Sequence, residues 1–458
     1  MVSPCYRLPA SERRRALTLG QLNGALWSIG NGLTTGPLVL YLAQDLGARG
    51  LALGLVLAAP NLAGLLRLAA PTLIHRWGTA KLACLRLSFA SYLLILGLPL
   101  VAMTPPTIPR SQALAIMIAL LFAHQVLEYF GTVAMWSWWA DLVPRAVRGR
   151  YFARRQMIQL AVLVPTIVVS GYFADAWRQR FRSEPDRLLI AYALPTGVGA
   201  ITLLASLAPL AMMPATRRYA SQGGSIEWAV LKAPLVDRRF WKFLTFRCWF
   251  SLSNGMTQTV QGIYPKQVLA FGVGDLAVMR TVMQAGQISA AHWVGSASDR
   301  YGNRPVLVAA QACVSASLLF FIMAYDERTR WLLVGAWVLF AAYVAHNICL
   351  PNLVLKLAPD ADKSAYIATS DALASLFHSA ATIGGGALFD WLRSTAPDSA
   401  VEPYRSCVIL LVTGVMLRSL GVVLLARINE PGAWRWREIL AGHPDQSSRA
   451  ADGQGATT

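Results

Sequence analysis

The sequence predicts an all-α integral membrane protein of twelve transmembrane helices, arranged as two related bundles of six. Three observations predict it: the composition is apolar, twelve long apolar runs follow one another, and the second half repeats landmarks of the first. Of the 458 residues, 55% are hydrophobic and 14% are charged, and the mean hydropathy is +0.45. A soluble domain with so few charges would be hard to keep dispersed, so lipid is the expected solvent.

Twelve runs are mainly apolar and about 20 residues long or longer, the length that a helix needs to cross the hydrocarbon core of a bilayer. In the first half they cover residues 17–42, 51–74, 82–103, 113–140, 157–177 and 188–213. In the second half they cover residues 240–269, 276–295, 305–325, 331–355, 367–391 and 406–427.

These runs divide the chain into five parts. A short N-terminal segment precedes the first bundle, a basic linker separates the two bundles, and a polar tail that we expect to be disordered follows the second. The boundaries are 1–15, 16–213, 214–239, 240–427 and 428–458.

The basic residues predict the orientation of the chain. The net charge is +18, and the Lys and Arg residues lie mainly between the apolar runs. This distribution favours cytoplasmic loops and anionic lipid over nucleic acid. An even number of spans puts both termini on one side, which is also the side richer in Lys and Arg, although the arginines of the loop 178–187 lie opposite. We therefore expect a multi-pass protein of the cell membrane with both termini in the cytoplasm.

An internal repeat relates the two halves. The segment LVPRAVRGRYFA from Leu142 aligns with LAPDADKSAYIA from Leu357, and the same offset places the G-x-x-x-D pattern ending at Asp175 on the one ending at Asp390. Helices 1 to 6 and 7 to 12 are thus predicted to be parallel repeats. Halves of this kind are related by an axis along the membrane normal, with a substrate site between them.

One motif carries a family resemblance. The segment GSASDRYGNRP, residues 295–305, follows the eighth run and matches G-x-x-x-D-R-x-G-x-R. It resembles the loop signature of the major facilitator superfamily in its second-half position, and the resemblance covers almost the whole chain. The first-half copy is degraded, with Pro71 for the opening Gly and His75 for the Asp. The resemblance implies two bundles that rock about a central solute site.

The resemblance also implies that this loop is a gate latch, whereas a plain solvated loop is the alternative. Gly295 is expected to permit close helix packing and Gly302 a turn with unusual backbone angles. Asp299 is expected to face a helix N-terminus or to pair with Arg300 or Arg304. In the first half, acidic and basic residues near the fourth loop could substitute for the missing acid. The predicted gating residues are Gly295, Asp299, Arg300, Gly302, Arg304, Arg76, Gly78, Asp141, Arg148 and Arg150.

Ionisable residues inside the apolar runs are costly and need a partner or a wet cavity. His124 and Glu128 stand four apart near the middle of the fourth run, on one helical face. Glu128 is a candidate for a coupling proton, and a structural pair with His124 or a nearby Arg is the alternative. Arg247 and Arg280 are candidates for holding an anionic substrate, although Arg247 could instead reach the cytoplasmic face.

In the resembling family, helices 1, 4, 7 and 10 line the cavity. Polar and aromatic residues at those places could line it here, or could join helices by hydrogen bonds. They are Trp27, Asn31, Trp136, Asn254, Gln258, Gln261, His346 and Asn347.

The chain carries no P-loop, no H-E-x-x-H and no Cys/His cluster with metal spacing. We expect no enzymatic activity and no cofactor. The predicted function is secondary active transport of a small solute by a monomer, driven by a proton or another ion gradient. The alternative is a transport-inactive sensor or binding protein of the same fold.

Overall fold

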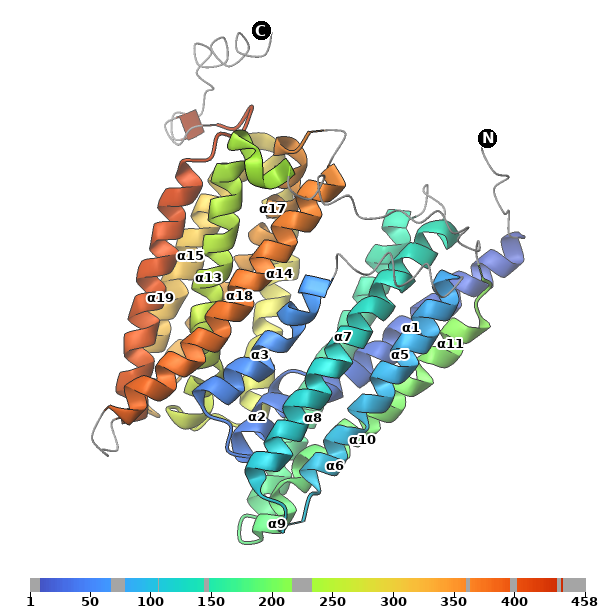
Figure 1. Cartoon of the computed structure of the whole chain (residues 1–458), viewed down its shortest axis with the longest axis vertical. Coiled ribbons are helices and arrows are strands. Elements are labelled where there is room, and N and C mark those ends of the chain that lie inside the picture. Colours follow the sequence, from blue (N-terminus) through green and yellow to red (C-terminus); the bar gives the residue numbers. More distant parts are fainter. Residues whose placement is uncertain are drawn as a thin grey trace. The chain divides into compact units, whose positions relative to one another are not determined.

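A computed structural model describes residues 9–66, 79–105, 107–143, 148–215, 233–359, 363–395, 402–434 and 438–439 (Figure 1). All the elements formed by these residues are helices, as the sequence predicts. The chain falls into two compact units: unit 1 comprises Met1–Ser225 and Phe271–Val278, and unit 2 comprises Ile226–Ala270 and Met279–Thr458.

Where they are described, the first six predicted spans coincide with helices of unit 1; residues 67–74 of the second span lie outside the described residues. Two short breaks divide the third and sixth spans, and Gly36, with a φ of 69°, divides the first just before Pro37. The helices are α1 (Ala10–Thr34), α2 (Pro37–Asp45), α3 (Gly50–Leu65), α5 (Ala80–Ile95), α6 (Gly97–Ala102), α7 (Arg110–Leu142), α8 (Arg148–Arg180), α9 (Pro185–Leu188), α10 (Ile190–Ala205) and α11 (Leu207–Met212).

The remaining predicted spans coincide with seven further described helices, two of which share the tenth span. They are α13 (Arg238–Gln267), α14 (Val273–Tyr301), α15 (Asn303–Met323), α16 (Leu332–Phe340), α17 (Tyr343–Leu357), α18 (Lys363–Ser394) and α19 (Glu402–Ala426). The division into units does not follow the sequence boundary, because the first turn of α14 belongs to unit 1.

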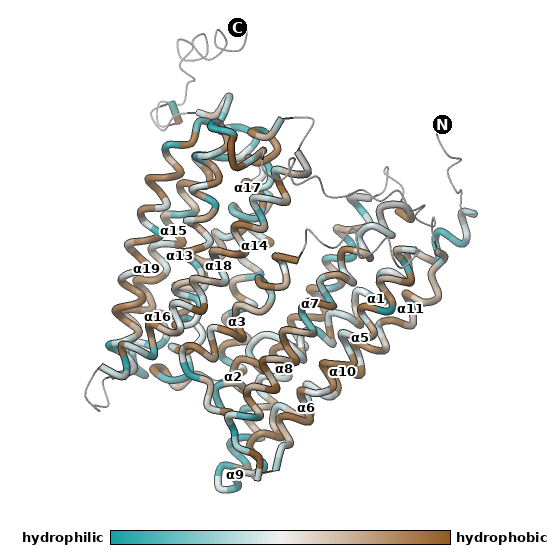
Figure 2. Tube along the Cα trace, in the orientation of Figure 1, coloured by the Kyte–Doolittle hydropathy of each residue, from teal (hydrophilic) through white to brown (hydrophobic). Residues whose placement is uncertain are grey.

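The helices are built for a bilayer. Within the described ranges, eight are long and apolar enough to cross a membrane. The helices α1, α13 and α14 have 25, 30 and 29 residues but are more polar than these eight. Figure 2 shows hydrophilic residues gathered at helix ends and mainly hydrophobic residues along α10 and α19. Large apolar side chains such as Phe89, Ile201 and Met416 are exposed, as expected where lipid is the solvent. The chain is a multi-pass membrane protein.

Within unit 1, α1 lies against both α8 and α10, and α5 lies against α7. Glycines permit the contact of α1 with α10: a Cβ added to Gly30 would lie 2.8 Å from the carbonyl oxygen of Gly199, and one added to Gly199 would lie 3.0 Å from that of Gly30. Since lipid gives no hydrophobic drive for helices to associate, such close backbone approach is what stabilises the crossing.

Within unit 2, α13 packs against α18 and α19, and α15 packs against α19. The cytoplasmic start expected for α13 carries a buried aromatic group, Phe240, Phe243 and Phe246, which packs with Leu353 of α17 and Leu425 of α19. These contacts define a core separate from that of unit 1.

The start of the tail differs from the expected disorder. Trp434 donates its backbone N–H to the carbonyl oxygen of Tyr301 at 2.9 Å, and the guanidinium of Arg304 donates to the carbonyl oxygens of Ile428 and Trp434 at 3.2 and 3.5 Å. Residues 428–434 are therefore packed against the loop between α14 and α15. Apolar groups also hold this segment, since Ile428 belongs to the buried core of unit 2 and the rings of Trp434 and Tyr301 meet edge-on with 5.4 Å between their centres. Residues 435–437 and 440–458 lie outside the described residues, so disorder of the rest of the tail stays a prediction.

Candidate functional site

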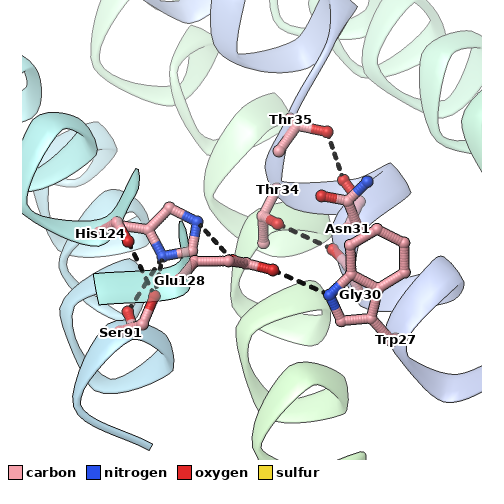
Figure 3. A network of polar contacts seen from close by, with 8 residues as sticks. All are labelled: Trp27, Gly30, Asn31, Thr34, Thr35, Ser91, His124 and Glu128. Atoms are coloured by element: carbon pink, nitrogen blue, oxygen red, sulfur yellow. Dashed lines mark hydrogen bonds and ion pairs between the residues drawn. The ribbon is translucent and has the colours of Figure 1, made fainter. Parts of the chain in front are cut away.

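The pair predicted on α7 is formed. The Nε2 atom of His124 lies 3.1 Å from Oε2 of Glu128, and only 2% of the His124 side chain and 16% of the Glu128 side chain are exposed. The other carboxylate oxygen, Oε1, accepts a hydrogen bond of 2.9 Å from Nε1 of Trp27 on α1 (Figure 3). The carboxyl group thus joins α1 and α7, with a ring nitrogen on each side.

Ser91 of α5 completes this network. Its hydroxyl lies 2.7 Å from Nδ1 of His124 and 3.0 Å from the carbonyl oxygen of the same residue, and its own carbonyl oxygen lies 3.1 Å from Nδ1. With a neutral His124 protonated on Nε2, the hydroxyl donates to Nδ1. With a cationic His124, Nδ1 donates to Ser91 and the hydroxyl donates to the carbonyl oxygen of His124. Both protonation states therefore have complete hydrogen bonds.

A cavity of about 300 Å³ lies beside this network in unit 1, and we call it the Arg155 cavity. Helices α1, α5, α7 and α8 supply most of its wall. Trp27 and Trp136, two predicted cavity residues, are part of that wall, together with the unpredicted polar residues Asn23, Ser28, Arg155, Gln156 and Gln159. The indole of Trp27 thus lines the cavity while its N–H is bonded to Glu128.

Arg155 is the functional candidate that sequence reasoning missed. It is 7% exposed, and its guanidinium donates to Gln159 Oε1 at 3.1 Å, to Asn23 Oδ1 at 3.3 Å and to the Gly20 carbonyl oxygen at 3.4 Å. The guanidinium also lies 4.5 Å from the centre of the Trp139 ring. All three acceptors are neutral. The fifth predicted run starts at residue 157, so Arg155 lies just outside it. The spacing of four between Arg155 and Gln159, which puts both on one helical face, is the signal in the sequence that points to this arginine.

The predicted cavity residues of the second half lie in unit 2 and bond mainly between helices. Tyr343 donates to Asn254 Oδ1 at 2.7 Å, and His346 Nε2 lies 2.9 Å from Gln311 Oε1. Gln258 Oε1 lies 2.7 Å from His378 Nε2. This pattern agrees with the reading of these residues as interhelical hydrogen bonds.

The other predicted residues have simpler surroundings. Gln261 donates to Thr257 Oγ1 at 3.0 Å within α13, and Arg247 pairs with Asp371 of α18 at 3.3 Å. Asn347 is exposed, Arg280 is partly buried in α14, and Asn31 lies one turn beyond Trp27 on α1. None of these five touches the Arg155 cavity.

The signature loop has the predicted turn but a different acid. Gly302 has a φ of 93° and precedes α15, as its place in the motif predicts. The backbone N–H groups of Asn303 and Arg304 donate to Glu430, at 3.1 and 2.6 Å. Asp299 is exposed instead. The carboxylate of Glu430, which follows α19, therefore lies at the N-terminus of α15, where the helix dipole favours negative charge.

Two expectations for the loop are corrected. Among the described residues, no atom lies within 4 Å of a Cβ added to Gly295, so no close packing occurs there. Arg304 bonds to carbonyl oxygens of the tail rather than to Asp299, because the tail runs directly across the start of α15.

Lys356 forms an ion pair with Glu430, with its Nζ atom 2.8 Å from Oε1 of the carboxylate. Burial of the carboxyl acts to raise the pKa of Glu430, but the hydrogen bonds from Lys356 and from the start of α15 outweigh it, and the pKa lies below its ordinary value.

The first-half gating candidates are only partly visible. Arg76 and Gly78 lie outside the described residues, and so do the side chains of Asp141 and Arg148, while Arg150 is exposed at the start of α8. The latch remains a prediction in both halves.

Comparisons with known proteins place the fold. A family model described as Major Facilitator Superfamily matches residues 22–386. An uncharacterized protein of Mycobacterium tuberculosis is 25% identical over 444 residues, covering 92% of this chain and 95% of its own, and one of Mycobacterium bovis matches equally.

Solved structures of similar fold include a D-xylose-proton symporter, with a TM-score of 0.67 at 12% identity over 91% of this chain and 97% of that chain. The nucleoside transporter NupG has a TM-score of 0.65 at 13% identity, over 90% of this chain and 98% of its own. A bacterial homolog of the human lysosomal transporter Spinster, in an inward-facing and occupied conformation, has a TM-score of 0.66 at 12% identity, over 94% of this chain and 100% of its own. At these identities the likeness is one of fold.

Proposed function

Because the chain belongs to the major facilitator superfamily, a family of membrane transporters, we propose that it is a secondary active transporter that carries a small solute by alternating access between its two six-helix halves. We place it in the cell membrane with both termini in the cytoplasm, as its basic loops predict, and take the monomer as the working unit. An ion gradient supplies the energy.

The observation that carries the choice of ion is the network of His124, Glu128 and Trp27. A buried carboxyl group in a membrane helix is costly unless it is partnered or serves a purpose. Here it has an imidazole at 3.1 Å, an indole N–H at 2.9 Å, and a serine that satisfies the imidazole in either protonation state. We infer that this network takes up and releases the coupling proton.

We propose that Trp27, which contacts both Glu128 and the cavity, couples proton binding to solute binding. Protonation of the carboxyl group removes the negative charge that holds the indole N–H, and a hydrogen bond to a charged acceptor is stronger than one to a neutral acceptor. A weaker bond lets the indole, which lines the cavity, change its position. Solute occupancy and proton occupancy then influence each other by the same amount in both directions.

Reconstitution tests the proposal. The purified protein is screened with sugars, nucleosides and organic acids for compounds that raise its melting temperature, since a ligand that binds the folded state stabilises it. Each such compound is then offered to proteoliposomes under an imposed pH gradient. We expect accumulation above the equilibrium level that a protonophore abolishes.

The control is liposomes without protein. Compounds that stabilise the protein but enter its vesicles no faster than the control vesicles would contradict transport and favour a sensor or binding protein.

A further inference from the structure

Within the described ranges, the positive charge of Arg155 is not balanced by an ion pair. Among the described residues no carboxylate forms an ion pair with it, and its three acceptors are two side-chain amides and a backbone carbonyl. Glu128, on the same side of unit 1, is already engaged by His124 and Trp27. A desolvated cation that faces a cavity without an acid is costly to keep, and a bound anion would offset that cost.

A second polar group in the same wall also lacks a partner. Ser28 of α1 lines the cavity and is only 1% exposed. Its hydroxyl has no hydrogen-bond partner among the described residues. A hydroxyl can donate to an anion beside the guanidinium. The described residues thus supply a cation and an unused donor to one cavity.

The guanidinium is held in a fixed orientation. The Trp139 ring lies 4.5 Å from its central carbon, and bonds to Asn23 and Gln159 fix two of its nitrogens. These bonds and the one from Nε occupy three of the five guanidinium N–H groups, which leaves two for a ligand. A preformed planar fork of this kind suits a carboxylate or phosphate group.

We propose that the Arg155 cavity binds a small organic anion, whose carboxylate or phosphate group lies against Arg155 and Ser28 and whose flat apolar body lies against Trp27 and Trp136. The volume of about 300 Å³ is at the lower end of ligand pockets and limits that body to about one ring. This inference names the substrate class of the proposed transporter, but binding at the site does not require that the protein transports.

Calorimetry on the purified full-length protein in detergent tests the site, with benzoate, its neutral isostere benzamide, and phenyl phosphate as probes. We expect benzoate or phenyl phosphate to bind at least tenfold more tightly than benzamide, and the tighter of the two identifies the preferred head group. Equal binding of benzamide, or no binding of either anion, would overturn the proposal. This comparison uses the unaltered chain and so does not depend on the folding of a variant.

Variants then locate the site. Arg155→Gln should weaken binding of the preferred anion at least tenfold, whereas Arg154→Gln, which removes the same charge from the exposed neighbouring residue, should leave it unchanged. Unchanged binding in Arg155→Gln protein that elutes as a single folded species would overturn the assignment. Binding without accumulation in proteoliposomes would support the site while contradicting the proposed transport.

Discussion

Individual polar side chains in unit 1 are accommodated in the membrane by contacts that cross between helices. The spacing of His124 and Glu128 was sufficient to predict that they meet, because residues four apart share a helical face. The bond from Trp27 to Glu128 joins residues 101 positions apart and could not be predicted from periodicity. Arg155 lies just before the predicted start of the fifth run, and its bonds to Gly20 and Asn23 on α1 could not be predicted from periodicity either.

Glu128→Gln should uncouple the proton from the solute. The glutamine keeps the shape of the side chain and can still accept the Trp27 N–H, but it cannot gain or lose a proton near neutral pH. We expect solute-driven proton movement to fall at least tenfold, which corresponds to a loss of about 1.4 kcal/mol in coupling free energy. Solute binding in detergent should be largely retained. A pH-sensitive dye trapped in proteoliposomes measures this movement.

Glu12→Gln, an exposed change near the start of α1, serves as the matched control. Undiminished proton movement in the Glu128→Gln protein would show that the pair is only structural.

The existence of the helices followed from the sequence, because every backbone polar group must be satisfied internally in lipid and a long apolar run has no other option. Their termini and contacts followed less well. The first predicted span, residues 17–42, is interrupted at Gly36, where φ is positive. The tail was expected to be disordered from its polarity, yet Glu430 caps α15 from there, and no local pattern indicates which distant acid will reach a helix start.

The crossing of α1 and α10 should be intolerant of added volume. A Cβ at Gly30 would meet both the Gly199 carbonyl oxygen at 2.8 Å and the Leu203 side chain at 2.6 Å. Gly30→Ala should therefore destabilise the protein by about 1–3 kcal/mol, the usual cost of overpacking. At Gly384 on α18, an added Cβ would meet no described atom within 4 Å, so Gly384→Ala should leave the free energy of unfolding unchanged or raise it slightly. Unfolding titrations in mixed detergent micelles compare the two, and equal stabilities would contradict the close crossing.

The Glu430 cap should make stability depend on pH in a defined direction. Its folded-state pKa lies below the ordinary value of 4.5, so the carboxylate stabilises the folded state above pH 4.5, and that stabilisation is lost as the pH falls through the folded-state pKa. Glu430→Gln should lower stability by about 1–3 kcal/mol at pH 7, as for hydrogen bonds to a charged group. The difference from the unaltered protein should shrink below pH 4.5.

Melting temperatures in detergent from pH 7 to pH 4 measure this effect. Glu327→Gln, at an exposed position between α15 and α16, is the control. If the difference in melting temperature between the Glu430→Gln and unaltered proteins stayed constant over this range, the charge of the carboxylate would not be the cause of that difference.

For the molecule as a whole, α14 is the helix that both units share, since its first turn belongs to unit 1 and the rest belongs to unit 2. Asp175 of α8 holds that first turn: its two carboxylate oxygens accept the backbone N–H groups of Val273 and Gly274 at 2.9 and 2.8 Å. Tyr41 of α2 donates to the Phe271 carbonyl oxygen at 2.8 Å. The internal repeat singled out Asp175 by its G-x-x-x-D pattern but gave no indication of its partner.

If the protein alternates between two states, we expect the bond between α8 and the start of α14 to be better formed in one of them and so to favour that state. Asp175→Ala removes a helix N-cap, which costs about 0.5–2 kcal/mol, and a change of 1.4 kcal/mol alters a population ratio about tenfold. The proposed orientation puts this contact at the non-cytoplasmic end. A cysteine placed at the buried Ser170 of α8 should therefore react several-fold faster with a membrane-impermeant maleimide in Asp175→Ala protein. The control is Glu184→Ala, which removes a carboxylate from an exposed ion pair near the same end and should leave the labelling rate unchanged, since such pairs contribute little to stability. Equal labelling rates in the Asp175→Ala and Glu184→Ala proteins would mean that the contact of Asp175 with α14 does not favour either state.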